Sequence, residues 1–181
     1  FQDLSSSPAT MAASKFADFY GALPGNDEEC ADVTSAYLQA LLGGTECWVE
    51  LPKHRWPKGW EGVYRRPVCP LIMALYGHPE AGGYWEMHCH EKVVAAGFER
   101  ACEEWPGCYW HSELKCFLVV YVDDLKMSGP KAGMKEAWKR LRKDLVMDDP
   151  EPSGRYLGCE HRTSEVKVNG KKYKIMSYDM E

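Results

Sequence analysis

The sequence predicts an α+β protein in which short antiparallel strands and amphipathic helices share one core. Residues 117–122 are six consecutive apolar residues rich in Val and aromatic side chains, a pattern that favours a buried strand. Two acids follow, and then Ser128, Gly129 and Pro130, so the chain should turn back there as a hairpin. Apolar residues at helical spacing between residues 84 and 96, and again after Pro130, supply the helices.

Length and composition indicate one medium domain. The chain has 181 residues, 45% of them hydrophobic, which is enough for a single sizeable core. No apolar run approaches the ~18 residues of a membrane span, and no signal-peptide pattern opens the chain, so we expect an intracellular protein with no membrane partner. The net charge of -5 does not indicate general nucleic-acid binding. One locally basic stretch contains Lys53, His54, Arg55, Lys58, Arg65 and Arg66.

The eight cysteines are scattered without the rhythm of a secreted disulfide framework, and we expect reduced thiols. One set could be a zinc site, although its spacing matches no regular zinc finger or knuckle. That set is Cys102, Cys108, His111 and Cys116, with His88 or His90 as a further candidate ligand.

The first third of the chain predicts two helices. Residues 5–7 resemble a cap with Pro8 at the first helical position, and this helix should end by residues 21–25. A second helix should begin near Asp32 and run to Leu42, where two glycines close it. From the residues alone, Asp32 either caps that helix or helps to hold a metal ion beside it.

The middle of the chain predicts a strand, a loop and a strand within residues 45–69, with strands at 48–51 and 62–64. Aromatic residues of the basic loop between them could stack on bases or simply pack. A helix should span residues 84–96 and end at Gly97, after a bare Gly-rich stretch that a ligand could approach closely.

The last part predicts strands at 108–110 and 116–122, and then an amphipathic helix after Pro130 that buries Met134, Trp138, Leu141 and Leu145. A strand should pass through residues 156–158. Residues 166–175 form a strong hairpin pattern around Asn169-Gly170.

Asp123 and Asp124, at the tip of the predicted acidic hairpin, are costly beside an apolar core unless something compensates their charge. A divalent cation is suited to this, because Mg²⁺ prefers carboxylate oxygens and accepts water or phosphate as further ligands. The alternative is that both are turn residues, a role that Asp favours.

Several motifs in order resemble the reverse transcriptase of copia-type long-terminal-repeat retrotransposons. Residues 32–38 (Asp-Val-Thr-Ser-Ala-Tyr-Leu) resemble its first aspartate motif, and 74–77 (Ala-Leu-Tyr-Gly), with Ala81 and Trp85, its second block. Residues 121–124 (Tyr-Val-Asp-Asp) match the polymerase signature, and residues 156–158 with the closing hairpin resemble the end of the palm.

The resemblance implies a fold, a reaction and a site. The fold would be a polymerase palm, an antiparallel sheet with helices packed on one face, with partial fingers and no thumb. The reaction would be RNA-directed DNA polymerisation, with two Mg²⁺ ions, or Mn²⁺, held by Asp32, Asp123 and Asp124. The partners would be an RNA or DNA template with its primer, and a dNTP. Tyr37 would crowd the sugar 2′-position and so favour deoxynucleotides, and Tyr76, Gly77 and Tyr121 would also lie at the substrate.

The departures from the family pattern keep two other functions open. Where the family has Lys-Gln-Ala-Pro-Arg, residues 79–83 read Pro-Glu-Ala-Gly-Gly, which removes cations that would contact phosphates. We expect residues 1–181 to form a single fingers-palm domain without a thumb or ribonuclease H. The first alternative is a catalytically silent nucleic-acid-binding remnant of such an element. The second is a small zinc-dependent interaction module on the Cys102 set.

Overall fold

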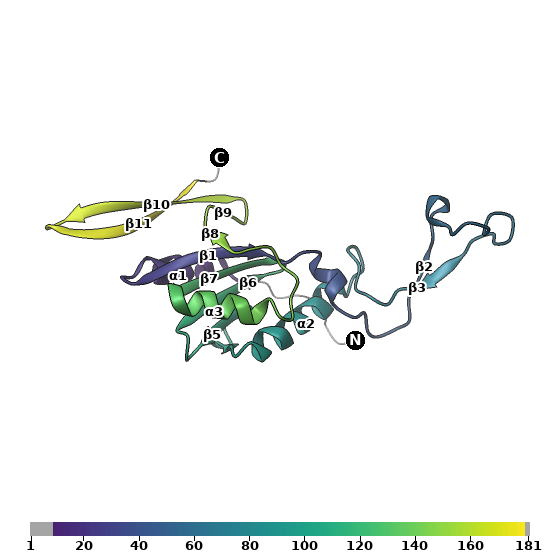
Figure 1. The fold of residues 1–181 in the computed structure, drawn as a ribbon, viewed down its shortest axis with the longest axis horizontal. Helices are drawn as coiled ribbons and strands as arrows, with labels where there is room; N and C mark the ends of the chain where they lie inside the picture. The colour runs from purple at the N-terminus through teal and green to yellow at the C-terminus, as the bar shows by residue number, and fades with distance from the viewer. Residues whose placement is uncertain (1–8, 180–181) are drawn as a thin grey trace.

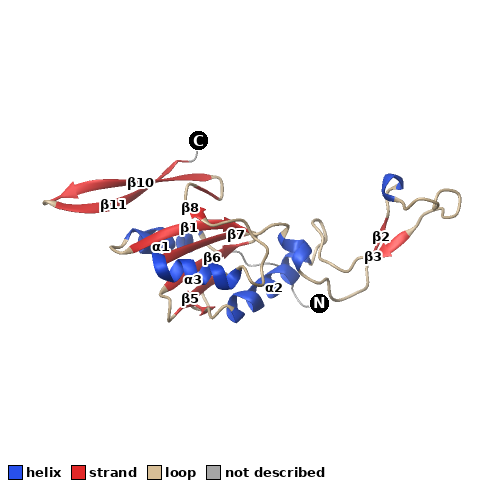
Figure 2. Ribbon diagram, viewed as in Figure 1, coloured by secondary structure: helices blue, strands red, loops and turns tan. Residues whose placement is uncertain are grey.

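The computed structural model describes residues 9–179, and it confirms the α+β class. Within these residues, three α-helices pack on a six-stranded sheet, a three-stranded sheet lies beside it, and a two-stranded sheet lies apart from it (Figure 2). Of the described helices, none has the length and apolar character needed to cross a bilayer.

The central sheet is antiparallel throughout, in the order β4-β5-β6-β7-β1-β8 (Figure 1). The predicted strands at 108–110 and 116–122 are confirmed as β5 and β6, and β6 and β7 form the predicted acidic hairpin. The strands are β1 (Asn26–Asp32), β4 (Glu99–Arg100), β5 (Cys108–His111), β6 (Cys116–Tyr121), β7 (Asp124–Pro130) and β8 (Glu151–Pro152).

One face of the sheet packs against α2 (Ala81–Ala95) and α3 (Lys131–Leu141), which confirms both predicted helices. Leu118, Leu125 and Met127 alternate with residues of the opposite face, as the period of a strand requires. They meet Trp85 from α2 and Trp138 from α3 in the largest hydrophobic cluster.

The first helix, α1 (Met11–Ala22), lies on the opposite face, so the expected packing of helices on one face is correct for α2 and α3 only. Its small residues Ala13 and Ala17 are fully buried, which allows close contact with Cys108, Phe117 and Val119. Thr10 caps the helix by accepting a hydrogen bond from the Ala13 amide at 3.3 Å. The predicted cap at residues 5–8 lies outside the described residues.

The predicted second helix from Asp32 to Leu42 is wrong. Asp32 ends strand β1, and only Ala36–Gln39 forms a short 3₁₀ helix. Pairing of β1 with β7 along its length, and with β8 on its other edge, outweighs the helix propensity of the following residues. Ser35, at φ 51°, then turns the chain through the left-handed region.

Residues 43–73, here called the arm, project away from the sheet (Figure 1). The predicted strand at 48–51 is confirmed as β2 (Trp48–Glu50), but its partner is β3 (Val68–Pro70) and not residues 62–64. A short 3₁₀ helix, Lys53–Arg55, follows β2. Most side chains of the arm are exposed and form no core. Its regular structure therefore depends mainly on the pairing of β2 with β3.

The C-terminal sheet contains β9 (Arg155–Tyr156), β10 (Cys159–Val168) and β11 (Lys171–Asp179). The Asn-Gly hairpin is confirmed and is longer than predicted: Asn169 and Gly170 take φ values of 50° and 78°, as a two-residue turn of this type needs. Of the predicted strand at 156–158, only Tyr156 pairs with β10, because Leu157 and Gly158 form the turn to β10.

We predict that Gly133→Ala destabilises the protein by about 1 to 3 kcal/mol, although alanine is the better helix former. A Cβ at Gly133 would lie 2.3 Å from the Leu114 carbonyl oxygen, a backbone atom that cannot easily move. Urea unfolding measures the change. The neighbouring exposed Ala132, changed to Gly, should lose at most about 1 kcal/mol from helix propensity. A stabilised Gly133→Ala protein would mean that α3 packs less closely than described.

Candidate functional site: an acidic end of the sheet

The acidic hairpin is held in a specific conformation at its tip. Tyr121 and Asp124 are paired across β6 and β7, so Val122 and Asp123 form a two-residue turn. Val122 has φ 55°, a conformation that is costly for a β-branched residue and needs support from its surroundings. The indole of Trp85 supplies this support by donating a hydrogen bond to the Val122 carbonyl at 2.7 Å.

The three predicted aspartates lie at this end of the sheet, although their carboxylate oxygens are not all within 4.8 Å of one another. Asp32, the last residue of β1, is paired with Asp124, the first residue of β7. The next amide, that of Val33, donates to the Asp123 carbonyl at 2.8 Å. Asp32 does not cap a helix, so this one of its two predicted roles is wrong.

The carboxylates at this end repel one another. Burial raises the pKa of Asp124 to about 6, and the charges of Asp32 and Asp123 add to the shift. Burial also raises the pKa of Asp32, with further contributions from Asp123 and Asp148. Such mutual shifts are typical of carboxylates that share a site, and a bound cation would relieve them.

An open cavity of about 470 Å³ lies beside these acids. Every charged side chain that lines it, among the described residues, is acidic: Asp32, Asp124, Asp148, Asp149 and Glu151. Carboxylate oxygens with room for water or phosphate are the ligands that Mg²⁺ accepts, so the donor set fits this ion. The cavity is called the acidic cavity below.

Sequence reasoning missed Asp148. Its amide donates to the Asp32 carbonyl at 2.9 Å, and its carboxylate contributes to the raised pKa of Asp32. The only signal was the pair Asp148-Asp149 before Pro150, which reads as an ordinary loop. Asp149 forms an ion pair with Arg142, so its charge is partly compensated.

Gln39 was also missed. Its amide nitrogen donates to the carbonyls of Thr34 at 2.7 Å and Val146 at 2.8 Å, and its oxygen accepts from the Val146 amide at 3.0 Å. These bonds join the segment after Asp32 to the segment before Asp148. Gln39 is therefore a positioning residue for two of the acids.

The predicted substrate residues are partly brought together. The rings of Tyr37 and Tyr76 pack with centroids 4.4 Å apart. Burial raises the pKa of Tyr37, with contributions from Tyr76 and the charge of Asp123, so the pair lies on the Asp123 side of the site. Tyr121 is half-buried opposite Asp124. Gly77 follows Tyr76 at φ 92°, where a side chain would be strained.

The suggested zinc ligands do not come together. Cys108 packs on the α1 face, whereas Cys116 belongs to the cluster on the opposite face. His111 Nε2 lies 3.1 Å from Arg140 Nη1, and Cys102 is exposed. In the part of the chain that the structure describes, one set of three side chains offers ligand atoms all within 4.8 Å of one another, and it is elsewhere.

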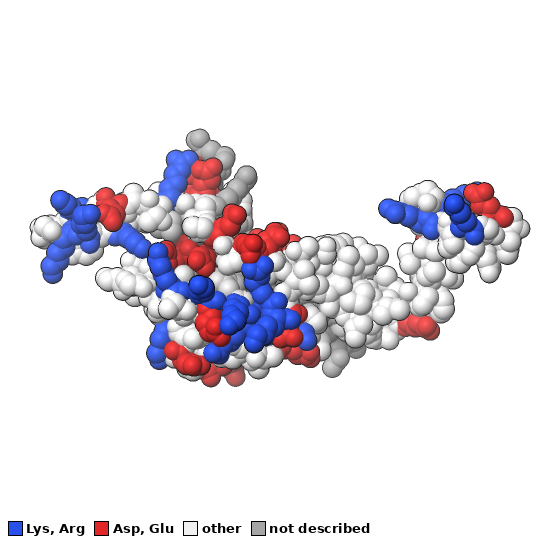
Figure 3. Space-filling model, in the orientation of Figure 1, with Lys and Arg blue, Asp and Glu red and all other residues white. Residues whose placement is uncertain are grey.

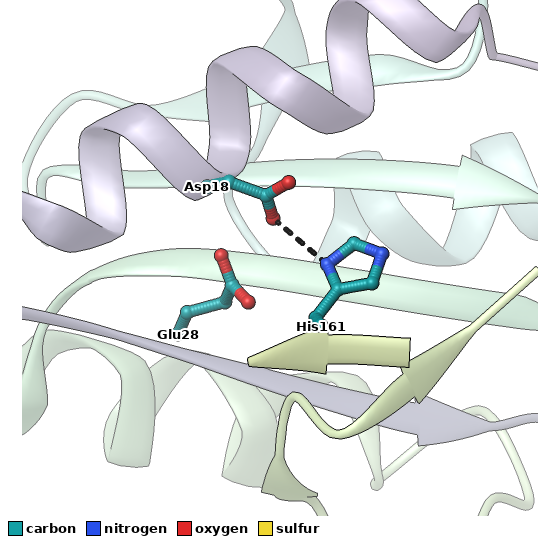
Figure 4. Close-up of side chains that lie close together, drawn as sticks. All are labelled: Asp18, Glu28 and His161. Carbon is teal, nitrogen blue, oxygen red and sulfur yellow. Dashed lines mark ion pairs between the residues drawn. The ribbon is translucent and has the colours of Figure 1, made fainter. Parts of the chain in front are cut away.

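That set is Asp18, Glu28 and His161, on the α1 face of the sheet (Figure 4). The ammonium of Lys126 lies among its ligand atoms: it forms an ion pair with Asp18 and lies 3.7 Å from Glu28 Oε1 and 3.3 Å from His161 Nδ1. The chain thus supplies its own cation where a metal ion would otherwise lie. The four residues are called the buried cluster below.

No protein-family model matches the chain, and a comparison with curated proteins finds no match. Function must therefore be inferred from the residues and their geometry.

We predict that Asp124→Asn stabilises the metal-free protein at pH 7 but not at pH 4. The folded pKa of Asp124 is raised from 3.8 to about 6, so its ionisation reduces stability as pH rises through this range. The gain at pH 7 should be about 1 to 2 kcal/mol after allowance for solvent screening, measured by urea unfolding with chelator present. Asp149→Asn is the control, since Asp149 is paired with Arg142. An equal difference between variant and wild type at both pH values would contradict the prediction.

Proposed function

We propose that the chain is the palm of an RNA-directed DNA polymerase that transfers a deoxynucleotide from a dNTP to a primer 3′-hydroxyl. The observation that carries this proposal is the convergence of Asp32 with Asp123 and Asp124, from segments far apart in sequence, at one end of the sheet, where Asp32 and Asp124 line the acidic cavity. The order of the motifs, similar to that of copia-type reverse transcriptases, supports the same reaction.

Asp32, Asp123 and Asp124 would hold the divalent cations, with Asp148 close by. When bound, two such ions activate the attacking hydroxyl and stabilise charge on the transferred phosphate and its leaving group. The contribution of the protein is to fix carboxylates from separate strands. Three interactions hold them in place: the pairing of β1 with β7, the hydrogen bond from Trp85 to the Val122 carbonyl, and the hydrogen bonds of Gln39.

The packed pair Tyr37 and Tyr76 supports recognition of a nucleoside sugar. An aromatic wall beside the acids would leave little room for a 2′-hydroxyl and would favour deoxynucleotides. Gly77, in a conformation suited to glycine, would let the backbone approach the substrate closely.

The arm and the C-terminal hairpin support contact with a polyanion. Lys and Arg side chains gather over α3, at the tip of the β10–β11 hairpin and on the arm (Figure 3). On the arm, Trp60 packs against Tyr64 with ring centroids 4.9 Å apart, and such rings also offer faces on which bases can stack. Arg66 is paired with Glu50 at 2.6 Å, so it contributes less free charge.

Primer extension under single-turnover conditions, with protein in excess over primer and template, tests the proposed function. Excess protein keeps weak binding from hiding the chemistry. We expect Mg²⁺- or Mn²⁺-dependent extension that Asp123→Asn and Asp124→Asn each lower by about 100-fold or more. Asp144→Asn, at an exposed carboxylate outside the acidic cavity, should retain most of the activity. Extension that is equal in all variants would exclude this site, and metal-dependent binding of primer and template without extension would favour the silent remnant.

Sugar selection gives a separate prediction. Tyr37→Val should relieve crowding at the 2′-position and raise ribonucleotide use relative to deoxynucleotide use by about tenfold or more, with the acids untouched. The ratio of the two kcat/KM values measures it. Tyr64→Val, on the arm, is the matched control. An unchanged ratio would make Tyr37 a packing residue only.

A further inference from the structure

The buried cluster joins four elements around one ammonium group. Lys126 of β7 is 0% exposed, and Asp18 of α1, Glu28 of β1 and His161 of β10 surround it. Ser14 Oγ, also from α1, lies 3.5 Å from Nζ. In Figure 4, Asp18 descends from the helix, Glu28 rises from the strand and His161 points between them. Nothing in the proposed polymerase reaction uses these side chains.

The contacts of His161 bear on the number of protons in the cluster. Its Nδ1 lies 3.3 Å from Lys126 Nζ and 3.6 Å from Asp18 Oδ1 (Figure 4). Because an ammonium group can only donate, the closer contact is a hydrogen bond when Nδ1 carries no proton and His161 is neutral. Asp18 and Glu28 then share one ammonium, which leaves one excess negative charge in a buried site. A single further proton would neutralise it.

Glu28 is the group that carries this proton. Asp18 has partners for both oxygens, the ion pair with Lys126 and a hydrogen bond from the Tyr178 hydroxyl at 2.7 Å. Both Glu28 oxygens are buried without a hydrogen-bond partner. Burial raises the pKa of Glu28 to about 7, with the Asp18 carboxylate adding to the shift, whereas burial and Lys126 lower the pKa of His161.

The cluster attaches the C-terminal hairpin to the sheet. His161 of β10 is 7% exposed and Tyr178 of β11 bonds to Asp18, but residues 162–168 and 171–175 are exposed. The ring of Tyr156, just before the hairpin, has its centroid 4.8 Å from Lys126 Nζ, and Tyr156 also lines the acidic cavity. Release of the hairpin would therefore expose the cluster and remove one wall of that cavity.

We propose that the buried cluster is a proton-compensated clamp: when the hairpin lifts from the sheet, Glu28 releases a proton and His161 takes one up. At mildly acidic pH the proton that Glu28 releases and the proton that His161 takes up nearly cancel. The fraction of molecules with the hairpin closed therefore stays nearly constant as pH changes. This inference does not depend on polymerase activity.

The signs follow from linkage. For Glu28, the pKa with the hairpin closed is about 7, above the ordinary 4.5. Its titration therefore favours opening of the hairpin as pH rises from 4.5 to 7, and its contribution to the opening free energy no longer changes above pH 7. For His161, the closed pKa lies below the ordinary 6.5, so its titration favours opening as pH falls below 6.5. The two effects oppose each other between about pH 5.5 and 6.5.

Asp124 also titrates in this window, because its pKa is about 6 and it lines the cavity from which hairpin release would remove Tyr156, so the variants below are compared in an Asp124→Asn background. The other groups that face the cluster titrate outside the window. The pKa of Asp18 is lowered, despite its burial, by hydrogen bonds and the charge of Lys126, so it titrates at lower pH. Burial raises the pKa of Cys30 to about 11, and burial likewise raises the pKa values of Tyr156 and Tyr178. The uncharged polar neighbours are Ser14, Ser128 and Ser153. Lys174 and Asp27 share the small cavity that Glu28 lines, and Lys15 shares the cavity that His161 lines.

Native-state hydrogen exchange of the β10 and β11 amides in the full chain, corrected for the chemical exchange rate, tests the clamp. Wild-type opening should change by less than about threefold between pH 5.5 and 6.5. With His161→Gln, opening should increase up to about tenfold per pH unit as pH rises toward 7. With Glu28→Gln, it should increase by up to the same factor as pH falls below 6.5, and the double variant should be flat. His54→Gln, an exposed histidine on the arm, should behave as wild type.

Opposite slopes in the two single variants would support the clamp, and equal slopes would overturn it. A measurement on wild type alone guards against a variant that fails to fold: the ¹⁵N shifts of His161 should show a neutral ring with Nδ1 unprotonated at pH 6. A protonated His161 there would overturn the proposal. Stoichiometric zinc in protein purified without chelator, lost in His161→Gln, would also overturn it, because the metal would then replace the ammonium.

Discussion

The register of β1 against β7 is the constraint on which the rest of the structure depends. It pairs Asp32 with Asp124 at one end, Cys30 with Lys126 further along, and Glu28 with Ser128 beyond. Because side chains of a strand alternate between faces, all six lie on the α1 face of the sheet. A shift of β7 by one residue would turn Asp124 toward α2 and α3 and move Leu125 and Met127 out of the largest hydrophobic cluster to the α1 face. The apolar core thus fixes the position of both charged sites.

The two sites solve one electrostatic problem in different ways. At the buried cluster the chain supplies Lys126, and one proton completes the neutralisation. At the acidic cavity no basic side chain lines the wall among the described residues, and the pKa values of Asp32 and Asp124 are raised instead. Carboxylates without a cation of their own are costly in the folded protein. That cost has a function only if a cation binds there from outside.

Local patterns in the sequence were sufficient for the parts of the fold that short-range contacts decide. The apolar run before Asp123, the stripe of α3 and the Asn169-Gly170 turn each contain their signal within a few residues. β1 and the pairing of β2 with β3 were missed because the paired segments are separated in sequence. The helix predicted from Asp32 to Leu42 was wrong because residues 33–42 have the propensity of a helix. Among candidate site residues, the position of the aspartates at one end of the sheet could be predicted from ordered motifs. Asp148, Gln39 and Lys126 could not be predicted. An acid near a proline, a glutamine in a helical pattern and a lysine in a strand are common in any sequence, and the roles of these three residues depend on contacts with residues far away in the chain.

The central claim is that the convergent aspartates, and not the buried cluster, are where this protein takes up divalent cations. Anomalous diffraction from crystals grown with Mn²⁺, a dNTP and a primer-template duplex would locate the ions directly. Convergence of Asp32 with Asp123 and Asp124 predicts Mn²⁺ peaks within coordination distance of their carboxylates and none at Asp18, Glu28 and His161. A Mn²⁺ peak at the buried cluster with none at the aspartates would contradict the claim.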